Sequence, residues 1–146
     1  MSDCVMGIDI GTMGTKTNIY DAAGVLKGEA FEESVLHYPK PGWVEQDPEG
    51  LYGSALRTIR LALDRSGVAP GDIAALALTV QMAGVSTVDA DWSAPTHYDS
   101  WLDNRCAPYV AKLKAHEDAI FAKSGCAPSY NHGPKMLYWN NEHPDV

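Results

Sequence analysis

The stretch Asp9-Ile10-Gly11-Thr12-Met13-Gly14-Thr15-Lys16 carries more information about this chain than any other part of it. It lies between two strand-like runs, residues 4–8 and residues 17–20, so the pattern predicts a β-hairpin with a glycine-rich turn. Glycines let main-chain N–H groups approach a bulky anion, while the two threonines and the lysine add further donors. The aspartate faces a phosphate favourably only with a cation between them, because two anions repel each other. The stretch therefore predicts a site for a phosphate together with Mg²⁺.

An ordinary hairpin turn is the alternative interpretation, with glycine chosen for its backbone freedom and threonine for its β-propensity. The flanking Asp9 and Lys16 favour the phosphate site, because a bare turn needs neither charge. A Walker A loop is excluded, since it needs four residues between its glycines and runs into a helix. A dinucleotide-binding fingerprint is excluded as well, because the glycine spacing differs and a strand follows.

The hairpin resembles the first phosphate-binding hairpin of the FGGY carbohydrate kinases, which belong to the actin-like, ribonuclease-H-like ATP-binding folds. Four later stretches resemble the FGGY pattern in the expected order. Residues 41–49 are similar to a GWVEQDP segment, and residues 79–84 resemble a strand end that reads GQMHG in the xylulokinase branch. Residues 100–105 resemble a W-x-D-x-R element, and residues 135–146 resemble a helix that reads KLLWLKENHPE. The resemblance spans the whole chain.

The resemblance implies a kinase that transfers the γ-phosphoryl group of ATP to a hydroxyl of a pentulose or a related sugar or polyol. It implies ATP and Mg²⁺ as cofactors, with Asp9 holding the metal through water. The residues expected at the cofactor are Asp9, Gly11, Thr12, Gly14, Thr15 and Lys16. The residues expected at the carbohydrate are Gln81, Met82, Trp101, Asp103 and Arg105. Amide, carboxylate and guanidinium groups bond hydroxyls, and a tryptophan face supports C–H surfaces, so this set suits a polyol.

Several of these residues also allow purely structural interpretations. Asp103 and Arg105 could pair with each other on the surface, and Trp101 could belong to a core. Trp43 and Glu45 are more typical of loop packing than of a ligand contact.

The chain departs from the family pattern in two ways. Ala83 stands where the xylulokinase branch usually has histidine, which puts D-xylulose as the substrate in doubt. FGGY kinases are also several times longer than this chain, and their catalytic aspartate and adenosine pocket come later. We therefore expect an N-terminal kinase domain over residues 1–146, without the C-terminal nucleotide-binding lobe, with no catalytic base before residue 146 and no activity on its own. The alternative is a non-catalytic sugar- or nucleotide-binding module with the same fold.

Composition excludes several classes of function. The net charge of −8 argues against nucleic-acid binding, which depends on clustered lysines and arginines. No apolar run reaches the ~20 residues of a membrane span, and the chain start lacks a signal-peptide pattern. The three cysteines are widely spaced, without a CxxC pair, so neither a disulfide framework nor a zinc site is indicated. We expect a cytoplasmic protein with a small-molecule partner, and a homodimer stays open for the full-length protein.

The order of predicted elements completes the fold class. The first 35 residues predict three strands, and a helix begins at Pro48 and ends near Gly67, with residues 52, 55, 56, 59 and 63 on its buried face. Residues 73–80 form an apolar run typical of a strand covered on both sides, and a further strand is expected at 85–88. Helices are expected at 108–123 and 134–140. We predict an α/β, ribonuclease-H-like (actin-like ATPase) fold, with a mixed sheet that begins with three consecutive antiparallel strands and is flanked by helices.

Overall fold

The computed structural model describes residues 3–146, which divide into two compact units. Unit 1 contains the chain as far as Val35 together with Glu49–Gln81, and unit 2 contains Leu36–Pro48 together with Met82–Val146. The stretch predicted as one domain therefore contains two packing units, each of which is described by itself.

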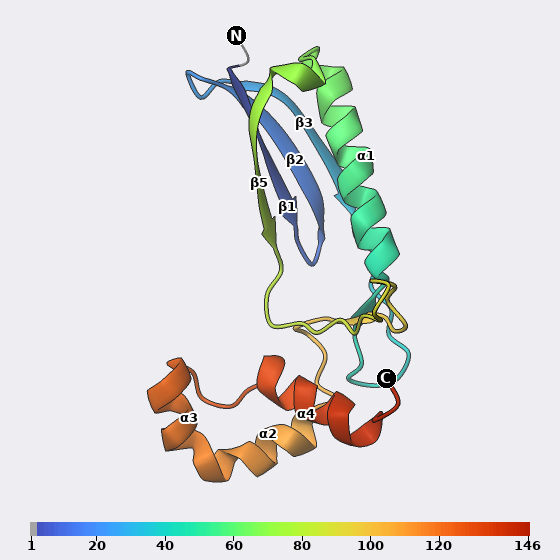
Figure 1. Ribbon diagram of the computed structural model, residues 1–146, viewed down its shortest axis with the longest axis vertical. Helices are drawn as coiled ribbons and strands as arrows, with labels where there is room; N and C mark the ends of the chain where they lie inside the picture. Colours follow the sequence, from blue (N-terminus) through green and yellow to red (C-terminus); the bar gives the residue numbers. More distant parts are fainter. Residues whose placement is uncertain (1–2) are drawn as a thin grey trace. The chain divides into compact units, whose positions relative to one another are not determined.

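Unit 1 is built on a four-stranded sheet in the order β3-β2-β1-β5 (Figure 1). Its strands are β1 (Cys4–Ile10), β2 (Gly14–Asp21), β3 (Leu26–Glu33) and β5 (Ile73–Val80). The pairs β1/β2 and β2/β3 are antiparallel, whereas β5 runs parallel to β1. This confirms the predicted mixed sheet that begins with three antiparallel strands.

Helix α1 (Pro48–Ser66) packs on one face of this sheet through small residues and hydroxyls. The Thr15 and Ser54 hydroxyls lie 2.6 Å apart, and Thr17 donates to the Thr58 hydroxyl at 2.9 Å. The apolar core beneath the helix consists of Met6, Ile8, Ile19, Ala30, Ala55 and Ala62. The prediction that Tyr52 belongs to the buried face is wrong, because its side chain is 61% exposed and the hydroxyl-bearing residues take that place.

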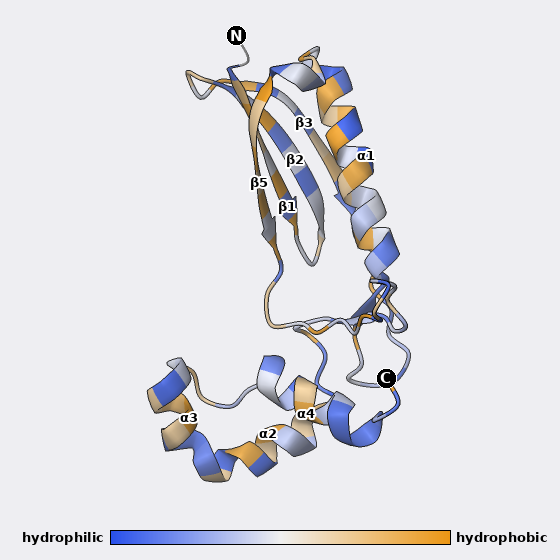
Figure 2. Cartoon of the chain, in the orientation of Figure 1, coloured by the Kyte–Doolittle hydropathy of each residue, from blue (hydrophilic) through white to orange (hydrophobic). Residues whose placement is uncertain are grey.

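Strand β5 is less covered than its sequence suggests. Leu76, Leu78 and Val80 are 57%, 59% and 52% exposed, so the prediction of a strand buried on both sides is wrong for the described residues. The polar contacts between α1 and the sheet are made to β2 and β3, as in the Thr17–Thr58 and Arg57–Glu32 pairs, and the apolar core adds Met6 and Ile8 of β1. β5 is the edge strand at the end of the sheet opposite β3, and of its residues only Ile73 packs against the core. Figure 2 shows that β5 is mostly hydrophobic, whereas hydrophobic and hydrophilic residues alternate along α1.

Unit 2 contains a two-stranded ribbon and a group of short helices. The ribbon pairs β4 (Glu45–Gln46) with β6 (Tyr98–Asp99). The helices are α2 (Ala107–Leu113), the 3₁₀ turn η2 (Lys114–His116), α3 (Glu117–Ser124) and α4 (His132–Glu142), and a further 3₁₀ turn, η1 (Pro70–Asp72), belongs to unit 1. Among residues 3–146 we find no helix with the length and apolar character needed to cross a bilayer.

Two predicted elements of unit 2 take another form. The strand expected at residues 85–88 is reduced to one bridge between Val85 and Asp99. The helix expected at 108–123 is divided by η2, whose short sequence Lys-Ala-His offers no apolar stripe to hold a continuous helix. The helical region ends after α3 at Gly125, which adopts the left-handed conformation at φ 73°.

Candidate functional site

The predicted phosphate turn is a tight reversal between β1 and β2. The Gly11 N–H donates to the Gly14 carbonyl at 2.9 Å, which leaves Thr12 and Met13 at the tip. Neither glycine adopts a positive φ. A Cβ on Gly14 would lie 2.3 Å from the Phe31 ring and 2.5 Å from the Glu32 carbonyl oxygen. Glycine at position 14 is therefore required by the close approach of β3, a reason that the sequence did not reveal.

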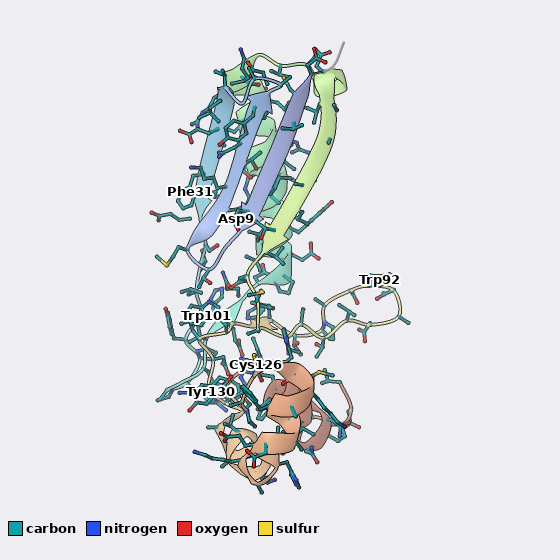
Figure 3. All side chains as sticks on the ribbon, turned by 90° about the vertical axis from the view of Figure 1, so that its left-hand side faces the viewer. Asp9, Phe31, Trp92, Trp101, Cys126 and Tyr130 are labelled. Carbon is teal, nitrogen blue, oxygen red and sulfur yellow. The ribbon has the colours of Figure 1, made fainter. Side chains whose placement is uncertain are left out.

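Asp9 and Lys16 are partners across this hairpin and are exposed on the sheet face opposite α1. Figure 3 views that face, with Asp9 and Phe31 labelled on it and α1 behind the sheet. The Lys16 ammonium lies 3.4 Å from the Glu29 carboxylate. An open hollow of about 340 Å³ is lined by Asp9, Lys16 and Thr79, among others. The carboxylate and the ammonium that distinguished this turn thus line the same hollow.

Thr15 differs from the other predicted cofactor residues. Its side chain is fully buried on the α1 side of the sheet, where its hydroxyl bonds Ser54. Alternation along β2 places Thr15, Thr17 and Ile19 on that side and Lys16 on the other. The expectation that the Thr15 hydroxyl points at a phosphate is therefore not supported, and the alternation with the apolar Ile19 was the signal that could have shown it.

Gln81, predicted at the carbohydrate, lies beside the phosphate turn. The Thr12 hydroxyl donates to the Gln81 side-chain carbonyl at 3.0 Å, and the Gln81 N–H donates to the Ile10 carbonyl at 2.9 Å. Position 81 follows the end of β5, which is parallel to β1, so both strands bring their carboxyl ends to the same edge of the sheet. The structure therefore joins one residue of each predicted set within unit 1.

In unit 2, Asp103 and Arg105 form a buried, bidentate pair. The Arg105 Nε and Nη2 atoms donate to the two Asp103 carboxylate oxygens at 2.9 and 2.8 Å. Asp103 also accepts from the N–H groups of Val44 at 2.7 Å and of Arg105 at 2.9 Å. Asp103 is fully buried and the Arg105 side chain is 2% exposed, so the pair lies inside the unit and not on its surface. Direct contact with a carbohydrate is not supported for either side chain.

Further charges surround the Arg105 guanidinium. It donates to Glu45 at 2.7 Å, lies 3.2 Å from Asp99, and stacks 3.8 Å above the Trp43 ring. Trp43 and Glu45 thus both contact Arg105, as the packing interpretation expects. Burial raises the pKa of Asp99 to about 6, against the opposing effects of Arg105 and Trp139. Burial alone would lower the pKa of Arg105, but its carboxylate neighbours raise it above the usual range.

The remaining predicted carbohydrate residues are accessible in unit 2. Trp101 is 49% exposed and Met82 is 80% exposed, so Trp101 is not a core residue. Ala83 adopts a positive φ of 63°, which is uncommon for a residue with a side chain. At Gly84 a Cβ would collide with the Tyr98 hydroxyl, so the chain passes directly against that ring. Strained or tightly packed backbone of this kind often occurs at functional sites.

The residues present fit a magnesium ion bound mainly by phosphates. Within residues 3–146, no group of three or more metal-binding side chains is assembled. Mg²⁺ commonly keeps several waters and takes one or two carboxylates together with substrate phosphates. A single exposed aspartate beside a phosphate turn meets that requirement, and Asp9 is in this position.

The chain matches known proteins along nearly its whole length. The model of the "FGGY family of carbohydrate kinases, N-terminal domain" matches residues 4–146. A glycerol kinase of Rhizobium rhizogenes is 38% identical over 118 residues, which is 80% of this chain and 24% of the relative. A glycerol kinase of Nitrobacter hamburgensis is 37% identical over 138 residues, covering 92% of this chain and 27% of the relative. This chain therefore spans about a quarter of the length of these curated relatives.

Solved structures show the same fold. A ligand-bound xylulose kinase from Lactobacillus acidophilus superposes with a TM-score of 0.86 at 26% identity, over 98% of this chain and 29% of that one. A xylulose kinase from Rhodospirillum rubrum superposes with a TM-score of 0.90 at 22% identity, over 97% of this chain and 30% of that one. These neighbours confirm the predicted actin-like fold.

Proposed function

Because this chain belongs to the FGGY family of carbohydrate kinases, we propose that its protein transfers the γ-phosphoryl group of ATP to a hydroxyl of a small polyol or ketose. The relatives named above are glycerol and xylulose kinases, so the proposed substrates range from glycerol to a pentulose. We further propose that this chain alone binds its ligands but does not catalyse phosphoryl transfer, because it spans only about a quarter of the length of the relatives.

The observation that carries this proposal is the hydrogen bond from Thr12 to Gln81. Phosphoryl transfer depends on holding the terminal phosphate against the accepting hydroxyl, with the charge neutralised around both. A residue from the phosphate turn that bonds a residue assigned to the carbohydrate supports one shared site for the two reactants.

The chain's own residues then take distinct roles. Gly11, Thr12, Gly14 and Lys16 meet the β- and γ-phosphates, and Asp9 holds Mg²⁺ through water; the ion supplies charge neutralisation at the transferring group. Gln81, Met82 and Trp101 contact the carbohydrate. Asp103 and Arg105 do not contact the carbohydrate themselves. They hold the loop that carries Trp101.

The proposed setting follows from the cofactor and the thiols. The thiols of Cys4, Cys106 and Cys126 are free, which fits a reducing compartment that supplies ATP. We place the protein in the cytoplasm on that basis, and we keep a homodimer as the proposed assembly of the full-length enzyme.

The decisive experiment is a coupled ADP-release assay on the complete gene product with a panel of glycerol, alditols, pentuloses and hexuloses. We expect magnesium-dependent turnover with one class of the panel and none from residues 1–146 alone. Carbohydrate binding without any ADP release from the complete gene product would instead favour the non-catalytic binding module.

A further inference from the structure

Lys135 is a fully buried lysine of α4 whose ammonium group holds two main-chain carbonyls of unit 2. Its Nζ atom donates to the carbonyl of Ser100 at 2.7 Å and to the carbonyl of Asp103 at 3.1 Å. The Asp103 N–H donates to the same Ser100 carbonyl at 2.9 Å. The two carbonyls bracket Trp101 and Leu102, so one side chain fixes both ends of the short loop that exposes Trp101.

Burial of an ammonium group is energetically unfavourable. Desolvation disfavours the charge, and an apolar residue of similar volume would pack at lower cost. Burial lowers the pKa of Lys135, while the carboxylates of Asp103 and Asp99 act in the opposite direction. The position is also unfavourable for a cation, because it lies near the N-terminus of the helix. What the ammonium provides, and an apolar residue would not, is the pair of directed bonds to the loop.

A second residue of α4 holds the same loop. The Trp139 indole N–H donates to the Asp99 carboxylate at 2.7 Å, and Asp99 directly precedes Ser100. Residues four apart share one face of a helix, so Lys135 and Trp139 form a continuous contact surface. Arg105 also binds the carboxylates of Asp99 and Asp103. The loop is therefore held by both α4 and Arg105, and it carries the half-exposed Trp101.

We propose that Lys135 is a positioning residue that sets the Trp101 loop for the carbohydrate, a role that rests on the proposed kinase function. The proposal assigns the Lys135 ammonium, together with Trp139, to the affinity for the carbohydrate and not to the chemistry of the phosphates. Loss of the bonds to Ser100 and Asp103 removes one of the holds on the loop that carries Trp101.

The test compares Lys135→Met with Lys123→Met in the complete gene product. Methionine is unbranched and only one atom shorter than lysine but donates no hydrogen bond, and Lys123 is an exposed lysine of α3. We expect Lys135→Met to raise KM for the carbohydrate by about tenfold or more while KM for ATP stays within about twofold. Lys123→Met should change neither. An equal rise in both KM values, or no rise in the carbohydrate KM, overturns the proposal.

Hydrogen exchange separates this proposal from the kinase function itself. In Lys135→Met, the amides of residues 100–105 should exchange faster, whereas those of β1 and β2 should keep their wild-type rates. Unchanged exchange in the loop overturns the positioning role even if the enzyme is active. If wild-type protein phosphorylates no member of the panel, the proposed function fails, and the role of Lys135 at a carbohydrate fails with it, while its hold on the loop is still decided by exchange.

Trp139→Phe provides a second variant in case the lysine substitution prevents folding. It removes the bond to Asp99 and keeps an aromatic ring, although a smaller one, in the contacts with Tyr138 and His143. We expect a smaller rise in carbohydrate KM, of about two- to fivefold, with the same selectivity over ATP. An unchanged carbohydrate KM would show that the contact of α4 with the loop does not reach the substrate.

Discussion

Thr17 on β2 donates a hydrogen bond of 2.9 Å to the hydroxyl of Thr58 on α1, and both residues are buried. The Thr58 hydroxyl in turn donates a hydrogen bond to the Ser54 carbonyl at 2.9 Å. A sheet and a helix are thus joined by a chain of hydroxyls where an apolar contact would be the usual arrangement.

Replacing one end of this chain should cost more than replacing both. Thr58→Val leaves the Thr17 hydroxyl buried without its acceptor, so we expect a loss of about 1–3 kcal/mol in the free energy of unfolding. Thr17→Val combined with Thr58→Val should recover part of that loss, because both polar groups are gone. Urea unfolding followed by far-UV circular dichroism measures the cycle, and strict additivity would contradict the coupling.

Gly14→Ala should destabilise unit 1, although its φ is ordinary. The added methyl group would collide with the Phe31 ring and the Glu32 carbonyl, and overpacking of this kind costs about 1–3 kcal/mol. Gly7→Ala is the matched control, because a Cβ there meets nothing within 4 Å. The control should be neutral or slightly stabilising in the same urea experiment. Equal stability of the two variants would show that the contact with β3 does not dictate glycine.

Asp9→Ala should abolish turnover while leaving carbohydrate affinity nearly unchanged. We expect kcat to fall by about 10²-fold or more, because the carboxylate that holds the metal is lost, with KM for the carbohydrate within about twofold. Glu33→Ala, at an exposed carboxylate of β3, is the control. Steady-state kinetics over a range of Mg²⁺ concentrations provide the measurement, and unchanged turnover would remove Asp9 from the metal.

The stability of unit 2 should fall as the pH rises through the titration of Asp99. The folded-state pKa of about 6 lies above the ordinary value of 3.8, so the unfolded chain releases this proton first. The contribution of Asp99 is therefore full below about pH 4 and is lost by about pH 6–7, with an upper limit of about 3 kcal/mol. Asp99→Asn should remove this slope while the other carboxylates keep theirs.

Tryptophan fluorescence isolates this effect, because Trp43, Trp92, Trp101 and Trp139 all belong to unit 2. Urea unfolding of wild type and Asp99→Asn at matched ionic strength gives the difference in free energy at each pH. A difference that does not vary with pH would show that Asp99 titrates normally in the folded unit.

Ala83→His should improve a pentulose as substrate. Histidine is tolerated in the left-handed conformation that Ala83 adopts, and it adds a hydrogen-bonding group beside Gln81 in the sequence. One net hydrogen bond of about 1 kcal/mol corresponds to about fivefold in kcat/KM. Ala83→Gly is the control, since it relieves the backbone without adding a donor, and an equal gain from both would point to backbone strain alone.

Much of unit 1 could be predicted from sequence because its signals are local. Short-range physics accounts for the strand-like runs on either side of the turn, the proline that opens α1 and the glycine after it. The buried face of α1 could not be predicted by counting apolar residues, because Ser54 and Thr58 find hydroxyl partners on a distant strand. Coverage of β5 depends on where α1 crosses the sheet, which an apolar run does not encode.

The candidate site also contains some residues that local sequence signals indicate and others whose surroundings depend on distant parts of the chain. Asp9, Lys16 and the turn can be singled out from the sequence because their charges and glycines are unusual at that spacing, and their role at a phosphate stays a prediction. The burial of Asp103 and Arg105 depends on Glu45, Trp43 and α4, which lie far away in the sequence, so the pair was assigned to the surface or to a ligand. One overlooked signal was local: Lys135 stands near the N-terminus of a helix, where a cation needs a specific reason.

The margin of the sheet at β5 has a practical consequence for anyone who prepares this polypeptide on its own. Strand β5 exposes three apolar side chains, those of Leu76, Leu78 and Val80. Within residues 3–146 its backbone pairs with another strand on one side only. Such a strand is a template for further strands, so concentrated solutions should tend to form aggregates. A lysine in place of Leu78 is the simplest remedy for crystallisation or spectroscopy of these residues.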